Sequence, residues 1–421
     1  MQAIGMARRV FVAITLGIML AATAVLIACG NSSQTRFLLA ADTENSRVLL
    51  YSSPFITGQS ATAVLGQASA TSSAAPGAPT AALMAAPTGV TGDGFGNFYV
   101  ADTYYCRVLR FSPPFTTGMA ASFAIGQPDG ATNLTTDDCL SGTDATSASL
   151  AAPTGLAFDI AGNLWVADTT NSRVLKYPAP ITAGEAATVA LGQTTTGAAP
   201  LGCGPVASAA TLCLPSALAF DSAGNLWVVD TAYNRVLMYP PANLVTGGSA
   251  TVELGQPAAT AFTSDTVNNG GVSATSLFRP TGLAFDSAGN LWVADRSNNR
   301  VLMYAKADLA TNGAAATLEL GQPTATAFTT NTANPGGIGP STLNAPFGVA
   351  FDSSGRIFVS SGRLIVNPAS NNRTLVFTPP FSNGMNATLV LGQADFVTGT
   401  ANAGGESAAT QNGPLGIATA F

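Results

Sequence analysis

The sequence contains no histidine among its 421 residues. Without an imidazole the chain cannot form a Ser-His-Asp triad, a Cys-His pair or a histidine-ligated metal site. This absence excludes the most frequent arrangements for nucleophilic hydrolysis and for zinc binding. No residue is therefore assigned as catalytic or metal-ligating, and the composition argues against an enzyme.

Charged residues are also scarce, since Asp, Glu, Lys and Arg make up only 9% of the chain. The 16 basic residues are outnumbered by 22 acidic ones, which leaves a formal net charge of −6. A nucleic-acid partner requires a basic face for its phosphates, so none is expected. The surface should instead be covered by Ser, Thr, Asn, Gln, Ala and Gly.

Helical periodicity is missing beyond the N-terminal segment. Residues 280–304 instead contain three apolar runs of about five residues or fewer, bounded by Gly, Asn, Asp and Ser. A fourth run follows a linker at residues 316–322. This pattern predicts short antiparallel strands joined by tight turns.

The second run, residues 291–295, is apolar at successive positions, so both of its faces should be buried. Four-stranded sheets stacked face to face around an axis provide such burial. Because the 280–304 unit recurs along the whole chain, the sequence predicts an all-β fold, a β-propeller of four-stranded antiparallel blades.

Six copies of the unit can be counted. The N-terminal copy begins at its second strand, residues 37–42, and the C-terminal copy stops after its first strand, residues 414–421. We expect the C-terminal strand to complete the N-terminal blade, which closes the ring and removes two exposed edges. The alternative, five blades with frayed ends, does not explain why six strands end in Gly-Gln. These strand ends close at Gln67, Gln127, Gln193, Gln256, Gln322 and Gln393.

The motif Gly-Leu-Ala-Phe-Asp, Gly-Asn-Leu-Trp-Val-Ala-Asp, Asn-Arg-Val-Leu resembles the NHL repeat, and the resemblance covers nearly all of the chain after the N-terminal segment. It implies a six-bladed propeller with a binding or scaffold role and, in a minority of members, an enzymatic one. The sixth unit departs from the pattern. Ser361 stands where the fifth unit has Asp295, and a longer segment precedes Arg373.

Enzymes with similar propellers use two kinds of metal site. Peptide-amidating lyases use histidine-bound zinc, which this chain cannot provide. Gluconolactonase-like propellers hold a divalent metal on Glu, Asn and Asp around the channel. A metal-dependent lactonase or related hydrolase that acts at the channel mouth is therefore the alternative function, and its cofactor would be that metal. If the protein is not such an enzyme, no cofactor is expected. No glutamate lies in a first strand, where an axial ligand would be expected; the glutamates are Glu44, Glu185, Glu253, Glu319 and Glu406.

The N-terminus has the features of a secretion signal, with Arg8 and Arg9 before an uncharged run at residues 10–28. Small Ala28 before Cys29 resembles the lipobox of bacterial lipoproteins, which implies a lipid on Cys29 and membrane attachment through it. Gly30 rather than Asp after the cysteine implies the outer membrane, facing the periplasm or the surface. The alternative is an uncleaved signal anchor that spans the inner membrane.

The expected organisation is a signal peptide at 1–28, a tether at 29–36 and one propeller domain at 37–421. If Cys29 carries lipid, four cysteines remain. Cys203 and Cys213 lie in one inter-blade loop and can form a disulfide, and Cys106 then pairs with Cys139 by default. An oxidising compartment permits both bonds. A cysteine metal site is the weaker alternative, because no histidine joins the cysteines and their spacing is not a paired CxxC.

An aspartate ends the second strand of five units, and an arginine begins the third strand five residues later. Across a hairpin turn such a pair can form a bidentate contact, so we expect one structural turn clasp in each of these blades. A ring of carboxylates binding a metal or a cationic ligand is the alternative. The pairs are Asp42 and Arg47, Asp102 and Arg107, Asp168 and Arg173, Asp230 and Arg235, and Asp295 and Arg300.

Loops of roughly twenty polar residues join the blades, for example 257–276 and 323–342. In a four-stranded meander, the turn between the second and third strands lies on the same face as the passage to the next blade. We therefore expect function on that face or at the mouth of the axial channel. The expected role is a monomeric binding or assembly module for a protein, a peptide or a glycan.

Overall fold

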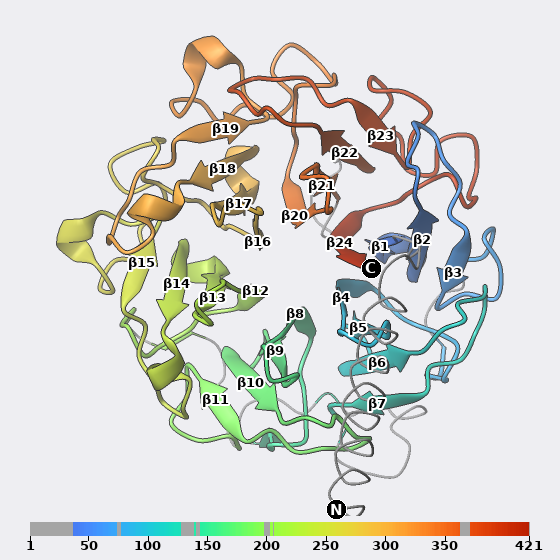
Figure 1. Cartoon of the computed structure of the whole chain (residues 1–421), viewed down its shortest axis with the longest axis horizontal. Helices are drawn as coiled ribbons and strands as arrows, with labels where there is room; N and C mark the ends of the chain where they lie inside the picture. The colour runs from blue at the N-terminus through green and yellow to red at the C-terminus, as the bar shows by residue number, and fades with distance from the viewer. Residues whose placement is uncertain are drawn as a thin grey trace, which may run out of the picture. The chain divides into compact units, whose positions relative to one another are not determined.

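In the computed structural model, the described residues are 37–73, 77–127, 139, 144–197, 203–204, 206–362 and 371–420. They form six four-stranded antiparallel sheets arranged in a ring (Figure 1). The predicted six-bladed β-propeller is thereby confirmed. The proposed signal peptide and Cys29 lie outside the described residues. Within the described part, no helix combines the length and the apolar character needed to cross a bilayer.

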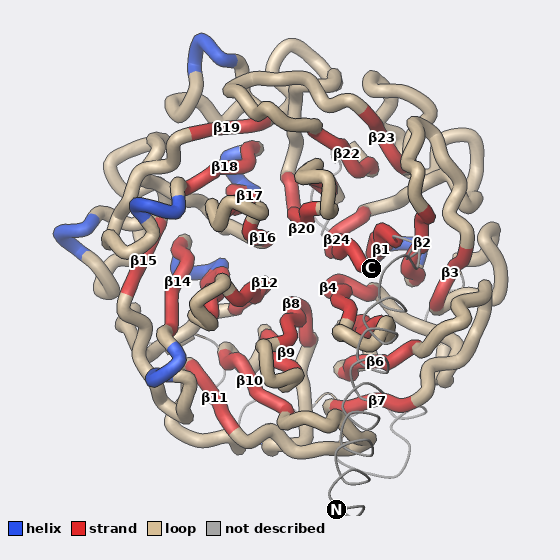
Figure 2. Tube along the Cα trace, viewed as in Figure 1, coloured by secondary structure: helices blue, strands red, loops and turns tan. Residues whose placement is uncertain are grey.

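The strands match the repeat units of the sequence. Figure 2 shows that loops make up much of the remaining chain, with a few short 3-10 turns such as η6 (Arg296–Asn298). The strands are β1 (Phe37–Asp42), β2 (Arg47–Ser52), β3 (Ala63–Leu65), β4 (Pro87–Gly92), β5 (Phe98–Asp102), β6 (Arg107–Phe111), β7 (Phe123–Ile125), β8 (Pro153–Phe158), β9 (Leu164–Asp168), β10 (Arg173–Tyr177), β11 (Val189–Leu191), β12 (Pro215–Phe220), β13 (Leu226–Asp230), β14 (Arg235–Tyr239), β15 (Val252–Leu254), β16 (Gly282–Phe285), β17 (Leu291–Asp295), β18 (Arg300–Tyr304), β19 (Leu318–Leu320), β20 (Pro346–Phe351), β21 (Ile357–Ser361), β22 (Arg373–Phe377), β23 (Leu389–Leu391) and β24 (Pro414–Ala420).

The ring is closed by the two ends of the chain, as the sequence predicts. The first blade has the strand order β24-β1-β2-β3, so the C-terminal strand is its innermost strand. The antiparallel register pairs Phe37 with Ala420 and Ala40 with Ile417. Every blade therefore contains four strands, and neither end of the ring presents an unpaired inner edge.

Tryptophans pack the blades against one another. The Trp227 ring lies 6.0 Å from the Phe285 ring of the next blade, in an edge-to-face arrangement. Its indole Nε1 donates a hydrogen bond to Asp221 in the first turn of its own blade, at 3.0 Å. Trp165 and Trp292 make equivalent contacts. The tryptophans are thus buried core residues and are not available to stack on a ligand.

Candidate functional site

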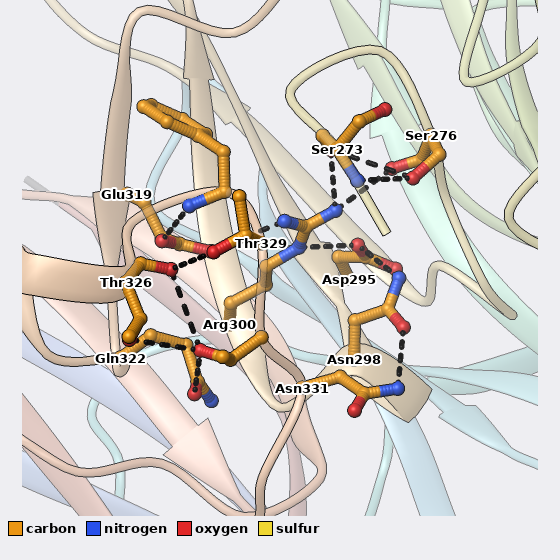
Figure 3. A network of polar contacts seen from close by, with 12 residues as sticks. Ser273, Ser276, Asp295, Asn298, Arg300, Glu319, Gln322, Thr326, Thr329 and Asn331 are labelled. Atoms are coloured by element: carbon orange, nitrogen blue, oxygen red, sulfur yellow. Dashed lines mark hydrogen bonds and ion pairs between the residues drawn. The ribbon is translucent and has the colours of Figure 1, made fainter. Parts of the chain in front are cut away.

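The Asp–Arg pairs occupy the base of the face that carries the long loops. In the fifth blade, Arg300 Nε donates to Asp295 Oδ2 at 2.8 Å, and both side chains are fully buried (Figure 3). The other carboxylate oxygen of Asp295 accepts the backbone N–H of Phe278 at 2.8 Å. The carboxylate therefore has partners on both oxygens within the fold, as a structural group should.

The same guanidinium holds two successive inter-blade loops. Arg300 Nη2 donates to the carbonyl oxygens of Ser273 and Ser276, at 2.9 and 3.0 Å, in the loop that enters the blade. Its Nη1 donates to Glu319 at 3.2 Å, and Glu319 also accepts the backbone N–H of Phe328 in the loop that leaves the blade (Figure 3). One arginine thus ties both loops to the sheet.

The structure brings together all five Asp–Arg pairs, with every member fully buried. Burial raises the pKa of Asp102 to about 6, while Arg107 and a backbone N–H donor oppose that increase. A buried carboxylate is stable only when its oxygens have ion-pair or hydrogen-bond partners within the protein, so these aspartates are unsuited to bind a free ligand. The Nε–Oδ2 distances are 2.6 Å for Arg47–Asp42, 2.8 Å for Arg107–Asp102, 2.7 Å for Arg173–Asp168, 2.8 Å for Arg235–Asp230 and 2.8 Å for Arg300–Asp295.

Two disulfides lie on the same face. Cys106, in the turn between β5 and β6, is bonded to Cys139, and Cys203 is bonded to Cys213. The backbone N–H of Cys213 donates to the clasp carboxylate of Asp230 at 2.6 Å. The Cys106–Cys139 disulfide therefore joins an inter-blade loop to a turn that carries a clasp, whereas Cys203–Cys213 links two positions of one inter-blade loop.

An apolar depression of about 400 Å³ lies across the turns of the first three blades. Its lining includes Glu44, Tyr104 and Thr170, each two residues beyond a clasp aspartate, and the Cys106–Cys139 disulfide. Tyr104 is 60% exposed, and Glu44 and Thr170 are also exposed. Because Thr88 lines both this depression and the axial channel, the depression adjoins the channel mouth.

The axial channel itself is narrow, with a cavity of about 80 Å³. A glycine in five of the six lining strands brings neighbouring backbones into close approach, and Ala217 takes this position in β12. A Cβ added at Gly282 would collide with the carbonyl oxygen of Phe347, and one at Gly416 with that of Thr88. The other three glycines in this position are Gly89, Gly155 and Gly348.

We expect Gly282→Ala to destabilise the protein by about 1–3 kcal/mol, because the added methyl must displace the backbone of the next blade. Chemical denaturation of the purified variant measures this change. Gly94→Ala is the matched control, since a Cβ there meets nothing within 4 Å and its φ is not positive. Equal stability of the two variants would show that the inner strands are less tightly packed than described.

The residues around the channel do not fit a divalent-cation site. The described lining consists of Gly, Thr, Ser and apolar residues, without a carboxylate, an imidazole or a thiol. Glu253 and Glu319 lie in the fourth strands and pair with Arg235 and Arg300. In the described part of the chain, no group of three or more His, Cys, Asp or Glu residues could hold a metal ion. Among the described residues that line the channel, the hydrolase alternative therefore finds no carboxylate, imidazole or thiol to hold a metal ion.

Sequence reasoning missed the hydroxyl contacts that join adjacent blades. Thr103 Oγ1 donates to the carbonyl oxygen of Pro153 at 2.7 Å, and Thr169 Oγ1 donates to that of Pro215 at 2.8 Å. A signal for them exists, because a threonine follows the clasp aspartate in four blades. The four are Thr43, Thr103, Thr169 and Thr231.

Comparisons with known proteins agree with this architecture. Residues 279–304 match the model of the NHL repeat family. A search of curated protein sequences finds no match. A structure of a nidogen/laminin complex is similar with a TM-score of 0.50 and 12% identity, over 92% of this chain and 98% of that chain.

Two further solved structures are similar at lower scores. Virginiamycin B lyase from Staphylococcus aureus, bound to quinupristin, matches with a TM-score of 0.39 and 12% identity, over 70% of this chain and 67% of that chain. A putative gluconolactonase matches with a TM-score of 0.40 and 14% identity, over 72% of this chain and 77% of that chain. The six sheets identify the chain as a six-bladed β-propeller, and the family match shows an NHL repeat in its fifth blade.

Proposed function

We propose that this protein is a rigid binding propeller that recognises a protein, a peptide or a glycan on its long-loop face. The proposed site is the depression around Tyr104, next to the channel mouth. The observation that carries the proposal is the exposed Tyr104 ring at a position where the other clasped blades have non-aromatic residues. Those residues are Glu44, Thr170, Ala232 and Ser297.

The turn that carries Tyr104 is held firmly. The neighbouring Tyr105 is buried, and its hydroxyl donates to the carbonyl oxygen of Gly77 at 2.7 Å. Cys106 follows and is tied to Cys139. An aromatic side chain on a fixed backbone loses little conformational entropy on binding, which favours its use as a binding anchor. The apolar floor of the depression, with Ala86 and Ala152, suits such a contact.

We further propose that the protein is exported to the bacterial cell envelope as a monomer and anchored to the outer membrane by lipid on Cys29. The sequence around Cys29 supports this, and two disulfides in the propeller suit an oxidising compartment. Loss of Arg8 and Arg9 with the signal would leave 14 basic and 22 acidic residues. A mature protein this acidic suits a partner other than nucleic acid.

Tyr104→Ala should weaken capture of the ligand about thirtyfold or more, as expected for loss of an aromatic anchor worth about 2 kcal/mol. The ligand is first isolated from solubilised envelopes or from a glycan array with the wild-type protein, and its dissociation constant is then compared between variants. Phe95→Ala is the matched control, because Phe95 is 88% exposed in the turn at the opposite end of β5. Equal losses in both variants, or no ligand in repeated captures, would contradict the proposal.

Cys29→Ala should move the protein from the membrane fraction to the soluble fraction, because the acylated thiol is the proposed anchor. Immunoblotting of fractionated cells measures the distribution. Ser32→Ala, on the tether, should leave the protein in the membrane fraction. Continued membrane retention of Cys29→Ala would favour the uncleaved spanning helix instead.

A further inference from the structure

The sixth blade keeps the arginine of the clasp and lacks its carboxylate. Ser361 pairs with Arg373 in the β21–β22 register, as Asp295 pairs with Arg300 in the fifth blade. Ser361 also faces Pro346 of the inner strand, as Asp230 faces Pro215 in the fourth blade. The backbone thus places serine where the clasped blades have aspartate.

In the clasped blades the aspartate collects donors from three sources. Arginine Nε donates to one oxygen, and the backbone N–H two residues before the inner-strand proline donates to the other. In the first, third and fifth blades, an asparagine amide two residues before the arginine adds a third donor. These contacts are Asn45 to Asp42 at 2.8 Å, Asn171 to Asp168 at 2.9 Å and Asn298 to Asp295 at 2.8 Å.

The sixth blade retains all three kinds of donor. Arg373 Nε and Ser361 Oγ are buried and have no hydrogen-bond partner among the described residues. Asn344, two residues before Pro346, is buried, and its backbone N–H donates to no described residue. The side-chain amide of Asn371 donates one N–H to Asn334 at 2.8 Å. Its second N–H corresponds to the one that Asn298 donates to the clasp carboxylate of Asp295 in the fifth blade.

The guanidinium of Arg373 also lacks a salt bridge to a carboxylate in the described part of the chain. The other clasp arginines all form salt bridges, whereas Arg373 has none within the described residues. Val390 stands opposite Leu375, where the fourth and fifth blades have a glutamate. Residues 363–370 contain no Asp or Glu. Burial lowers the pKa of Arg373 to about 10, although Asp395 opposes the effect.

We propose that the sixth blade binds a small monovalent inorganic anion, such as chloride, between Arg373, Asn344 and Ser361, where the clasped blades have a carboxylate. A buried guanidinium without a counter-charge is costly, and a halide supplies both the charge and the acceptor for the orphan N–H groups. Serine is smaller than aspartate, so the proposed anion would take the volume that the carboxylate fills in the clasped blades. Full burial of Ser361 and Arg373 restricts the occupant to a small ion.

The first test compares thermal unfolding of the full-length protein in sodium chloride and in sodium gluconate at equal ionic strength. Because an anion that binds only the folded state stabilises it, Tm should rise by about 1–3 °C in chloride. Crystals soaked in bromide should show an anomalous peak beside Arg373 Nε. Equal Tm in both salts, together with an ordered water and no bromide at this position, would overturn the proposal.

Variants separate this site from general salt effects. Ser361→Asp should raise Tm and abolish the difference between chloride and gluconate, because the side chain then supplies the carboxylate. Asp168→Ser should create a second chloride site, in the third blade. Ala190 stands opposite Leu175 there, whereas the fourth and fifth blades have a glutamate at this place in the fourth strand. The fourth strand of the third blade therefore supplies no carboxylate to replace that of Asp168. A chloride effect that persists unchanged in Ser361→Asp would refute the assignment. If that variant does not fold, the bromide experiment on the wild-type protein still decides.

Discussion

A chain that ends after Gly413 is expected to lose cooperative folding. The truncation removes β24, which is the innermost strand of the first blade and packs against β4 and β20 of the adjacent blades. It exposes the inner edge of β1 and deletes the buried side chains of Leu415 and Ile417. The expected loss exceeds about 5 kcal/mol, which is comparable to the whole stability of many domains. Circular dichroism during heating should show no sigmoidal transition.

Complementation provides the control for this truncation. A synthetic peptide of residues 414–421 should restore the transition, because it supplies the missing strand. The same peptide with Gly416→Ala should fail, since the added methyl would collide with the carbonyl oxygen of Thr88. A truncated chain that melts like the wild-type protein would mean that the C-terminal strand does not close the ring.

Asp295→Ala is expected to destabilise the protein by about 3–5 kcal/mol, the usual cost of breaking a buried ion pair. Arg300 would keep its charge in the interior without a partner on Nε, and the Phe278 N–H would lose its acceptor. The loop that enters the fifth blade would also loosen. Urea denaturation monitored by tryptophan fluorescence measures the free energy of unfolding.

Two comparisons isolate the cause of this loss. Asp308→Ala removes an exposed carboxylate near the same blade and should change stability by less than about 0.5 kcal/mol. The triple variant Asp295→Leu, Arg300→Met and Glu319→Leu should be more stable than Asp295→Ala, because it removes all three buried charges and leaves neither Arg300 nor Glu319 without a partner. If Asp295→Ala is as stable as Asp308→Ala, the clasp does not hold the blade.

Much of the architecture could be predicted because it depends on local pattern. The continuous apolar run at residues 291–295 indicates a strand buried on both faces, and β17 is fully buried. The regular recurrence of the unit sets the number of blades. The split unit at the two ends indicates ring closure, since an incomplete blade would leave its edge unpaired.

The partners of the clasps were predictable only in part. The five-residue spacing of Asp295 and Arg300 indicates a pair across a turn, and the two side chains are in contact. The same arginine also binds the carbonyl oxygens of Ser273 and Ser276, in the loop before the blade. Loop carbonyls carry no side-chain signal, so no pattern in the sequence identifies them as partners.

The sequence by itself determined the repeat, the six blades, their closure and the exclusion of histidine chemistry, because these depend on residue types and their spacing. Only the tertiary structure decided that the channel is narrow and that the depression lies beside Tyr104. It also showed that Arg373 is buried and that its Nε has no partner within the described part of the chain. The physical reason is that the width of the channel, the exposure of a side chain and its contacts depend on atoms contributed by segments far apart in the sequence.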